Sequence, residues 1–135
     1  MTLEKVISEL KKISEEVPKP LRLPTSADIA TIEKVLETKL HPDFKQYLLE
    51  GSDAVFGVLE PAVAIQDDPN YIVYIVRQAR ENGIPETLFP ICEDNGDYYC
   101  INNLGEILFW SHNGTTNETW ANLASWIKEV WIEGN

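Results

Sequence analysis

The sequence has few cysteines and histidines, and it lacks a long apolar run. Its 135 residues include two Cys and two His, which is too few cysteines for a disulfide scaffold. Its longest apolar runs fall far short of a membrane span, and charged residues alternate with apolar ones at the N-terminus, so no signal peptide is visible. These absences predict a reduced, cytoplasmic protein. Its length and its hydrophobic content of 44% predict one globular domain over residues 1–135.

Basic residues are scarce in the second part of the chain. Residues 1–50 carry eight Lys or Arg against nine Asp or Glu, whereas residues 51–135 carry three against thirteen. No Lys or Arg occurs between Arg80 and Lys128. The acidic residues in that gap are Glu81, Glu86, Glu93, Asp94, Asp97, Glu106 and Glu118. A surface of this sign repels nucleic acid and anionic membranes and attracts a basic partner. Acidity can also serve solubility alone, and charge by itself does not decide between the two.

Motifs for catalysis and cofactor binding are absent from the sequence. It has no glycine-rich phosphate loop, no zinc-ligand spacing and no Gly-x-Ser-x-Gly elbow. Cys92, Cys100 and His112 lie on or near neighbouring predicted strands, so a Cys–His pair is geometrically possible, although strand cysteines flanked by apolar residues are more often inert. Residues 93–97 resemble a calcium loop but lack the alternating ligands of an EF-hand, which favours an acidic hairpin turn. The sequence therefore predicts no catalytic residue, no metal and no cofactor.

The first third of the chain shows helical periodicity. Apolar residues at helical spacing predict an amphipathic helix over residues 2–16. Three prolines between residues 18 and 24 then predict an extended connector. Thr25 and Asp28 have the spacing of a capping box, which predicts the start of a second helix. Pro42 suits the first turn of a third, short helix.

After residue 54 the pattern changes to short apolar runs. Those at residues 55–59 and 62–65 predict two strands. Asp67-Asp68-Pro69 suits the cap of a helix over about residues 70–82. Residues 71–76 are rich in β-forming types, so helix and strand both stay open for that segment.

The last part of the chain predicts a meander and a closing helix. Residues 88–92 and 97–101 flank Asn95-Gly96, the strongest short hairpin signal. A two-residue loop there would place Cys92 opposite Tyr99, whereas a three-residue loop would place it opposite Cys100. A second turn leads into a third strand at residues 106–111. A helix over about residues 118–132 follows, with Trp126 half exposed at the edge of its apolar stripe.

These elements predict an α+β fold. A mainly antiparallel sheet ending in a C-terminal meander should be packed by the N-terminal helices and by the C-terminal helix.

Several segments between residues 24 and 131 also have a family-like order and spacing. They are Ala27-Asp28-Ile29, Leu40–Leu49, Leu88–Cys92, Gly96–Ile101, Gly105–His112 and Leu123–Ile127. Together they resemble the SUKH superfamily, which includes the fungal cell-wall assembly regulator and many bacterial toxin-immunity proteins. His41 between Leu40 and Pro42, and Asn102 in place of a frequent Asp, depart from the family pattern. The resemblance implies an α+β binding domain that typically neutralises a toxin, often a nuclease, by direct association, and it supplies no catalytic residue.

Three hypotheses of function follow. The first is a non-enzymatic immunity-type protein whose acidic surface covers a basic toxin domain, since nuclease surfaces are basic where they meet phosphate. The second is a regulatory adaptor without a toxin partner, as the fungal relatives suggest. The third is an enzyme that uses Cys92, Cys100 or His112.

For the first hypothesis, the expected partner is a basic protein, and neither nucleic acid nor a membrane. The candidate partner-binding residues are Glu93, Asp94, Asp97, Glu106 and Trp126. The oligomeric state stays open.

Overall fold

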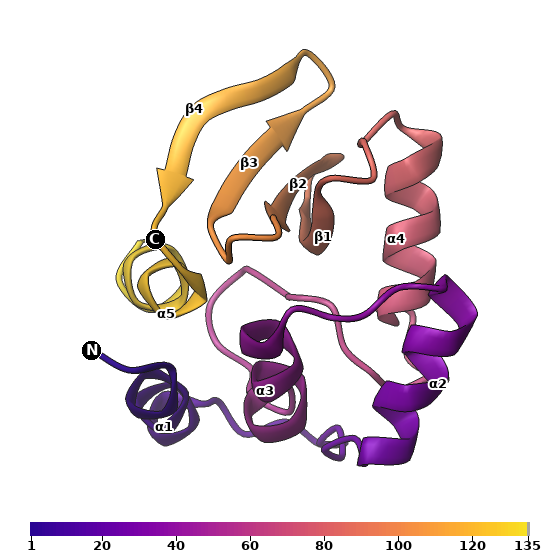
Figure 1. Ribbon diagram of the computed structural model, residues 1–135. Helices are drawn as coiled ribbons and strands as arrows, with labels where there is room; N and C mark the ends of the chain where they lie inside the picture. The colour runs from indigo at the N-terminus through magenta and orange to yellow at the C-terminus, as the bar shows by residue number, and fades with distance from the viewer. Residues whose placement is uncertain (135) are drawn as a thin grey trace.

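Three helices form the N-terminal part of the chain in the computed structural model, which describes residues 1–134 except for the side chains of residues 114 and 115. They are α1 (Leu3–Ile13), α2 (Ser26–Leu36) and α3 (Pro42–Gly51), as Figure 1 shows. The capping box of α2 is confirmed, because the Thr25 side chain accepts from the Asp28 N–H and the Asp28 carboxylate accepts from the Thr25 N–H. Pro42 lies in the first turn of α3, as predicted.

Residues 55–65, all of which are described, form no strand, so the prediction of two strands there is wrong. Val63 makes only an isolated bridge with Tyr71. Gly57 has a positive φ of 62°, and the proline at position 61 lacks a backbone donor, so a continuous ladder is interrupted. The last four residues of the segment are buried. Their apolar character therefore reflects burial in the core and not a strand.

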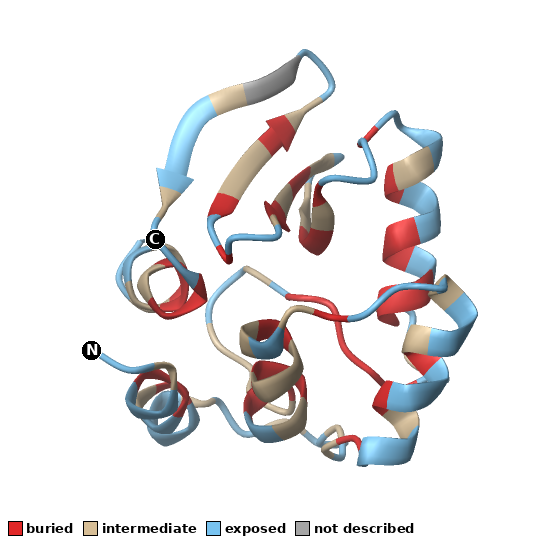
Figure 2. Cartoon of the chain, in the orientation of Figure 1, coloured by how far each residue is buried: buried red, intermediate tan, exposed pale blue. Residues whose placement is uncertain are grey.

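The segment with conflicting signals is helix α4 (Ile72–Glu81). Its β-forming residues recur at helical spacing, and Ile72, Val73, Ile75, Val76 and Ala79 are all buried. Figure 2 shows the buried positions of α4 on the side that faces the sheet and exposed positions on the outer side. Tertiary burial of one face thus outweighs local β propensity. No side chain caps α4, so the predicted cap at residues 67–69 is wrong.

The sheet has four antiparallel strands in chain order. They are β1 (Phe89–Asp94), β2 (Asp97–Ile101), β3 (Ile107–Ser111) and β4 (Gly114–Trp120). The predicted meander is confirmed, and Cys92 lies opposite Tyr99, as the two-residue loop requires. β4 was not predicted, because an edge strand with few apolar residues shows no clear alternation.

The closing helix begins later than predicted. It consists of α5 (Leu123–Trp126), which continues directly as the π-helical segment η1 (Ile127–Ile132). Asn122 determines the start, because its side chain accepts a hydrogen bond from the Ser125 N–H at 2.8 Å. Residues 118–120, predicted as helix, belong to β4.

Helices cover both faces of the sheet (Figure 1). On one side α4 packs on the sheet, where Asn82 donates to the buried Tyr98 hydroxyl at 3.2 Å. On the other side α5 places Trp126 against Tyr99, with ring centroids 5.1 Å apart. The result is the predicted α+β domain.

Candidate partner-binding surface

The acidic hairpin between β1 and β2 contains Glu93, Asp94 and Asp97, and it has the predicted tight turn. Asn95 and Gly96 both have positive φ, 54° and 90°, as a type I′ turn requires. Glu93 accepts the Gly96 N–H at 2.7 Å. One of the three carboxylates therefore has a structural role in the turn.

Asp97 links this hairpin to the next turn of the sheet. Its Oδ1 accepts the His112 backbone N–H at 3.2 Å and lies 3.3 Å from the His112 ring nitrogen Nδ1. His112 is exposed. Asp97 is therefore engaged by His112 and Glu93 by the turn, so Asp94 is the carboxylate of the hairpin that no cationic side chain or backbone N–H of the turn engages among the described residues.

Glu106 lies at the other end of the sheet. It is in the β2–β3 turn, where the Asn102 side chain donates to its Oε1 at 2.9 Å. The acidic hairpin precedes β2 and this turn follows it, so a strand of five residues, about 13 Å long, separates them. The structure therefore does not bring Glu106 together with the other acidic candidates.

Trp126 is buried, with an exposed fraction of 1%, so its predicted half exposure is wrong. It lies beneath the sheet, between Tyr99 and Trp131 (ring centroids 5.1 and 6.4 Å away). Its indole N–H has no hydrogen-bond partner among the described residues. Trp126 therefore supports the surface from below and exposes almost none of its own side chain.

Three half-buried aromatic residues above Trp126 were missed by the sequence reasoning. Tyr99, Phe109 and Trp120, here called the aromatic patch, come from β2, β3 and β4. The Tyr99 ring lies 4.8 Å from that of Phe109 and 5.8 Å from that of Trp120. The sequence does contain one signal for the patch, since aromatic pairs stand at residues 98–99 and 109–110 on two strands that it predicts to be adjacent. The third ring, that of Trp120, comes from β4, which the sequence does not predict.

Carboxylates border the aromatic patch. Burial raises the pKa of Tyr99 to about 12, and the negative charges of Asp94 and Glu118 add to the effect. Asp94 belongs to the acidic hairpin, and Glu118 is exposed on β4. The patch extends from Trp120, close to the start of α5, across Tyr99 toward the acidic hairpin at the opposite end of the sheet.

The cysteines do not form a nucleophilic site. Cys92 and Cys100 are free and fully buried, and burial raises the pKa of each thiol to about 12. Neither is therefore a thiolate at neutral pH. His112 is exposed and interacts with Asp97 instead. Among the residues described, no group of three or more His, Cys, Asp or Glu is placed to hold a metal ion.

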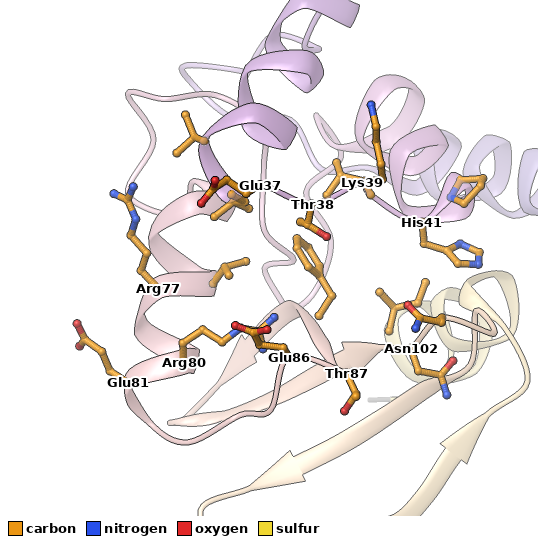
Figure 3. Close-up of a pocket in the computed structure, with 18 residues that line it drawn as sticks. Glu37, Thr38, Lys39, His41, Arg77, Arg80, Glu81, Glu86, Thr87 and Asn102 are labelled. Atoms are coloured by element: carbon orange, nitrogen blue, oxygen red, sulfur yellow. The ribbon is translucent and has the colours of Figure 1, made fainter.

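A groove of about 800 Å³ lies on another part of the surface (Figure 3). It is formed by the end of α2 with the segment before α3, by α4, and by residues near the ends of β1 and β2. Its walls carry both charge signs, from Glu37, Lys39, Arg77, Arg80, Glu81 and Glu86. Arg80 has a structural role, because its guanidinium donates to the carbonyls of Ile84, Pro85 and Leu88.

None of the helices in the described part of the chain is both long enough and apolar enough to cross a membrane.

Comparison with known proteins agrees with the sequence resemblance. A crystal structure of a protein from Pseudomonas syringae pv. tomato superposes with a TM-score of 0.92 at 37% sequence identity, over 96% of this chain and 98% of that chain. No curated protein matches significantly. The family model SUKH_5, described as SMI1-KNR4 cell-wall, matches residues 3–132, almost the entire length. The chain therefore belongs to the SMI1-KNR4 (SUKH_5) family.

Proposed function

We propose that this protein is a non-enzymatic, immunity-type binding protein that neutralises a basic toxin domain, such as a nuclease, by direct association. The observation that carries the proposal is the acidic hairpin, held by a tight turn at one end of a sheet that is packed by helices on both faces. A rigid negative surface of this kind accelerates association with a basic partner and penalises acidic ones. Membership of a family that includes immunity proteins supports the same function.

The test is coexpression with a candidate basic toxin domain, chosen from the products of the genes that neighbour this one. We expect the protein to restore growth of cells that produce the toxin domain and to form a stable complex with it in size-exclusion chromatography. A toxin domain that stays active and elutes separately would refute the proposal.

A second candidate is a regulatory adaptor without a toxin partner. The cell-wall description of the family favours it, and the groove of mixed charge offers a second binding surface that the acidic hairpin does not include. A gene with no toxin beside it, and a deletion strain that is no more sensitive than wild type to toxins from related strains, would favour the adaptor over the immunity protein.

A further inference from the structure

We propose that the aromatic patch, together with Asp94 and Glu118, is the anchor site for an arginine side chain of the basic partner. This inference rests on the proposed function and specifies where and how the partner is bound. It commits to one occupant, a guanidinium group presented on a basic protein surface.

The aromatic patch is a partly exposed surface built from three strands. Tyr99, Phe109 and Trp120 lie on three adjacent strands, and each is half-buried. Their rings meet at tilted or edge angles of 52° and 62°, with Tyr99 in the centre. The α5 helix covers only one end of this sheet face, since Ile101 and Ile107 are buried there while the patch retains solvent contact. Ring surface is therefore available to a partner.

The aromatic patch is held rigidly by the residues beneath and beside it. Trp126 is 1% exposed and supports Tyr99 from below at 5.1 Å. Strand backbones position all three rings, and the Thr116 hydroxyl also ties β4 to β3 by donating to the Phe109 carbonyl at 3.2 Å. Preorganised aromatic side chains lose little conformational entropy on binding, which is why Tyr and Trp dominate the centres of many interfaces.

The carboxylates near the aromatic patch carry negative charge that no cation of the described chain neutralises. Asp94 is two residues after Cys92, which lies opposite Tyr99, so strand alternation places Asp94 on the same face of the sheet as Tyr99, and Glu118 is two residues before Trp120 on β4. The charges of Glu93 and Asp97 are already engaged by the turn and by His112. No Lys or Arg of the described chain forms an ion pair with Asp94 or Glu118. A cation that neutralises these two carboxylates must then come from another molecule.

These features favour arginine over lysine. A planar guanidinium can stack on a ring face while its N–H groups donate to carboxylates at the rim, whereas an ammonium is a more strongly hydrated point charge. The patch offers ring faces and carboxylates together. The groove in Figure 3 also has carboxylates and one phenyl ring, but its cations Lys39 and Arg77 would repel a guanidinium.

The experiment uses two probes on the full chain, acetyl-tetraarginine amide and acetyl-tetralysine amide. Binding is followed by two-dimensional NMR, which reports separately on the indole N–H of Trp120 and on backbone amides across the surface. We expect the tetraarginine peptide to shift the Trp120 signal and to bind at least about threefold more tightly than tetralysine. The double variant Asp94→Asn, Glu118→Gln should bind tetraarginine about tenfold more weakly.

The matched control is Glu106→Gln with Glu86→Gln, which removes the same charge at other positions. It should weaken tetraarginine binding less than about twofold. Thermal unfolding of each variant checks that the fold is intact. The variant Phe109→Leu removes one ring of the patch and so measures how much that ring contributes to the affinity for tetraarginine. Equal weakening by the control pair, or shifts centred on Val35 and Arg77 in the groove, would overturn the anchor site.

The coexpression test keeps this inference separate from the proposed function. If the double variant still binds and neutralises the toxin domain at full strength, the anchor site is wrong and the proposed function stands. If tetraarginine binds at the patch but no toxin domain is neutralised, the proposed function fails and the guanidinium site remains.

Discussion

Reversing the charge of the acidic hairpin should slow association with a basic partner and leave the fold intact. The variant replaces Glu93, Asp94 and Asp97 with Lys. All three surround a turn whose central residues, Asn95 and Gly96, are exposed. Loss of the Glu93 acceptor for the Gly96 N–H and of the Asp97 acceptor for the His112 N–H should each lower the free energy of unfolding by about 1 kcal/mol, because water can replace each carboxylate at this exposed turn.

The magnitude follows from Coulomb's law and screening. With a partner cation about 10 Å from each carboxylate in the encounter complex, one reversal changes the interaction by about 0.8 kcal/mol before screening. At about 10 mM salt the Debye length is about 30 Å, so three reversals cost about 1.8 kcal/mol, or about twentyfold in association rate. At about 0.15 M salt the Debye length is about 8 Å, and the effect falls to about threefold.

The assay is stopped-flow association with the basic toxin domain at both salt concentrations. The control variant has the same net charge as the hairpin variant but carries its changes elsewhere. It combines Glu4→Lys in α1, Glu16→Lys in the connector after α1 and Glu50→Lys in α3, all at exposed positions. It should slow association much less than the hairpin variant. Equal rates for hairpin variant and wild type at low salt would mean that the hairpin serves solubility alone, and equal slowing by the control would mean that only net charge matters.

Three further predictions concern chemistry and stability. Cys92 and Cys100 should both be alkylated when the protein is unfolded without reductant. In the folded protein at pH 8 both thiols should react slowly, because burial keeps them protonated. If mass spectrometry showed both cysteines unmodified in the unfolded protein, they would form a disulfide. The triple variant Cys92→Ala, Cys100→Ala, His112→Gln should still neutralise the partner once folded, and loss of activity in a folded variant would indicate an enzyme. The pKa of Asp28 lies below its ordinary value of 3.8, chiefly because its carboxylate accepts the Thr25 backbone N–H, so its stabilisation is present above pH 3.8 and is lost as the pH falls through the lower folded value. Asp28→Ala should therefore lower the free energy of unfolding by about 1 kcal/mol at neutral pH. Urea titrations should show this difference between variant and wild type shrinking as the pH falls below 3.8, and a difference of constant size would contradict the capping role.

Features determined by local sequence were predicted well. Thr25 and Asp28 identify the start of α2 because the capping box needs only residues three apart. Asn95-Gly96 identifies the hairpin and its register because both residues tolerate positive φ. The family resemblance, with its α+β fold, also needed no structure and is confirmed over residues 3–132.

Features that depend on distant contacts were not predictable in this way. The apolar run at residues 62–65 predicts a strand, and only the packing shows that these residues are buried without forming a ladder. Tyr71–Val76 stayed ambiguous until one helical face met the sheet. β4 has a weak apolar periodicity because it is an edge strand, so the sequence does not predict it. As a result, the predicted closing helix begins near residue 118, within β4, whereas the observed helix begins at Leu123.

The partner-binding surface shows the same division. The sequence by itself determined that the acidic residues cluster in the second part of the chain and that three of them surround one tight turn. Only the tertiary structure separated Glu106 from that turn, buried Trp126 and assembled the aromatic patch from three strands. The physical reason is that charge and turn type are properties of neighbouring residues, whereas exposure depends on which other segments pack against a side chain.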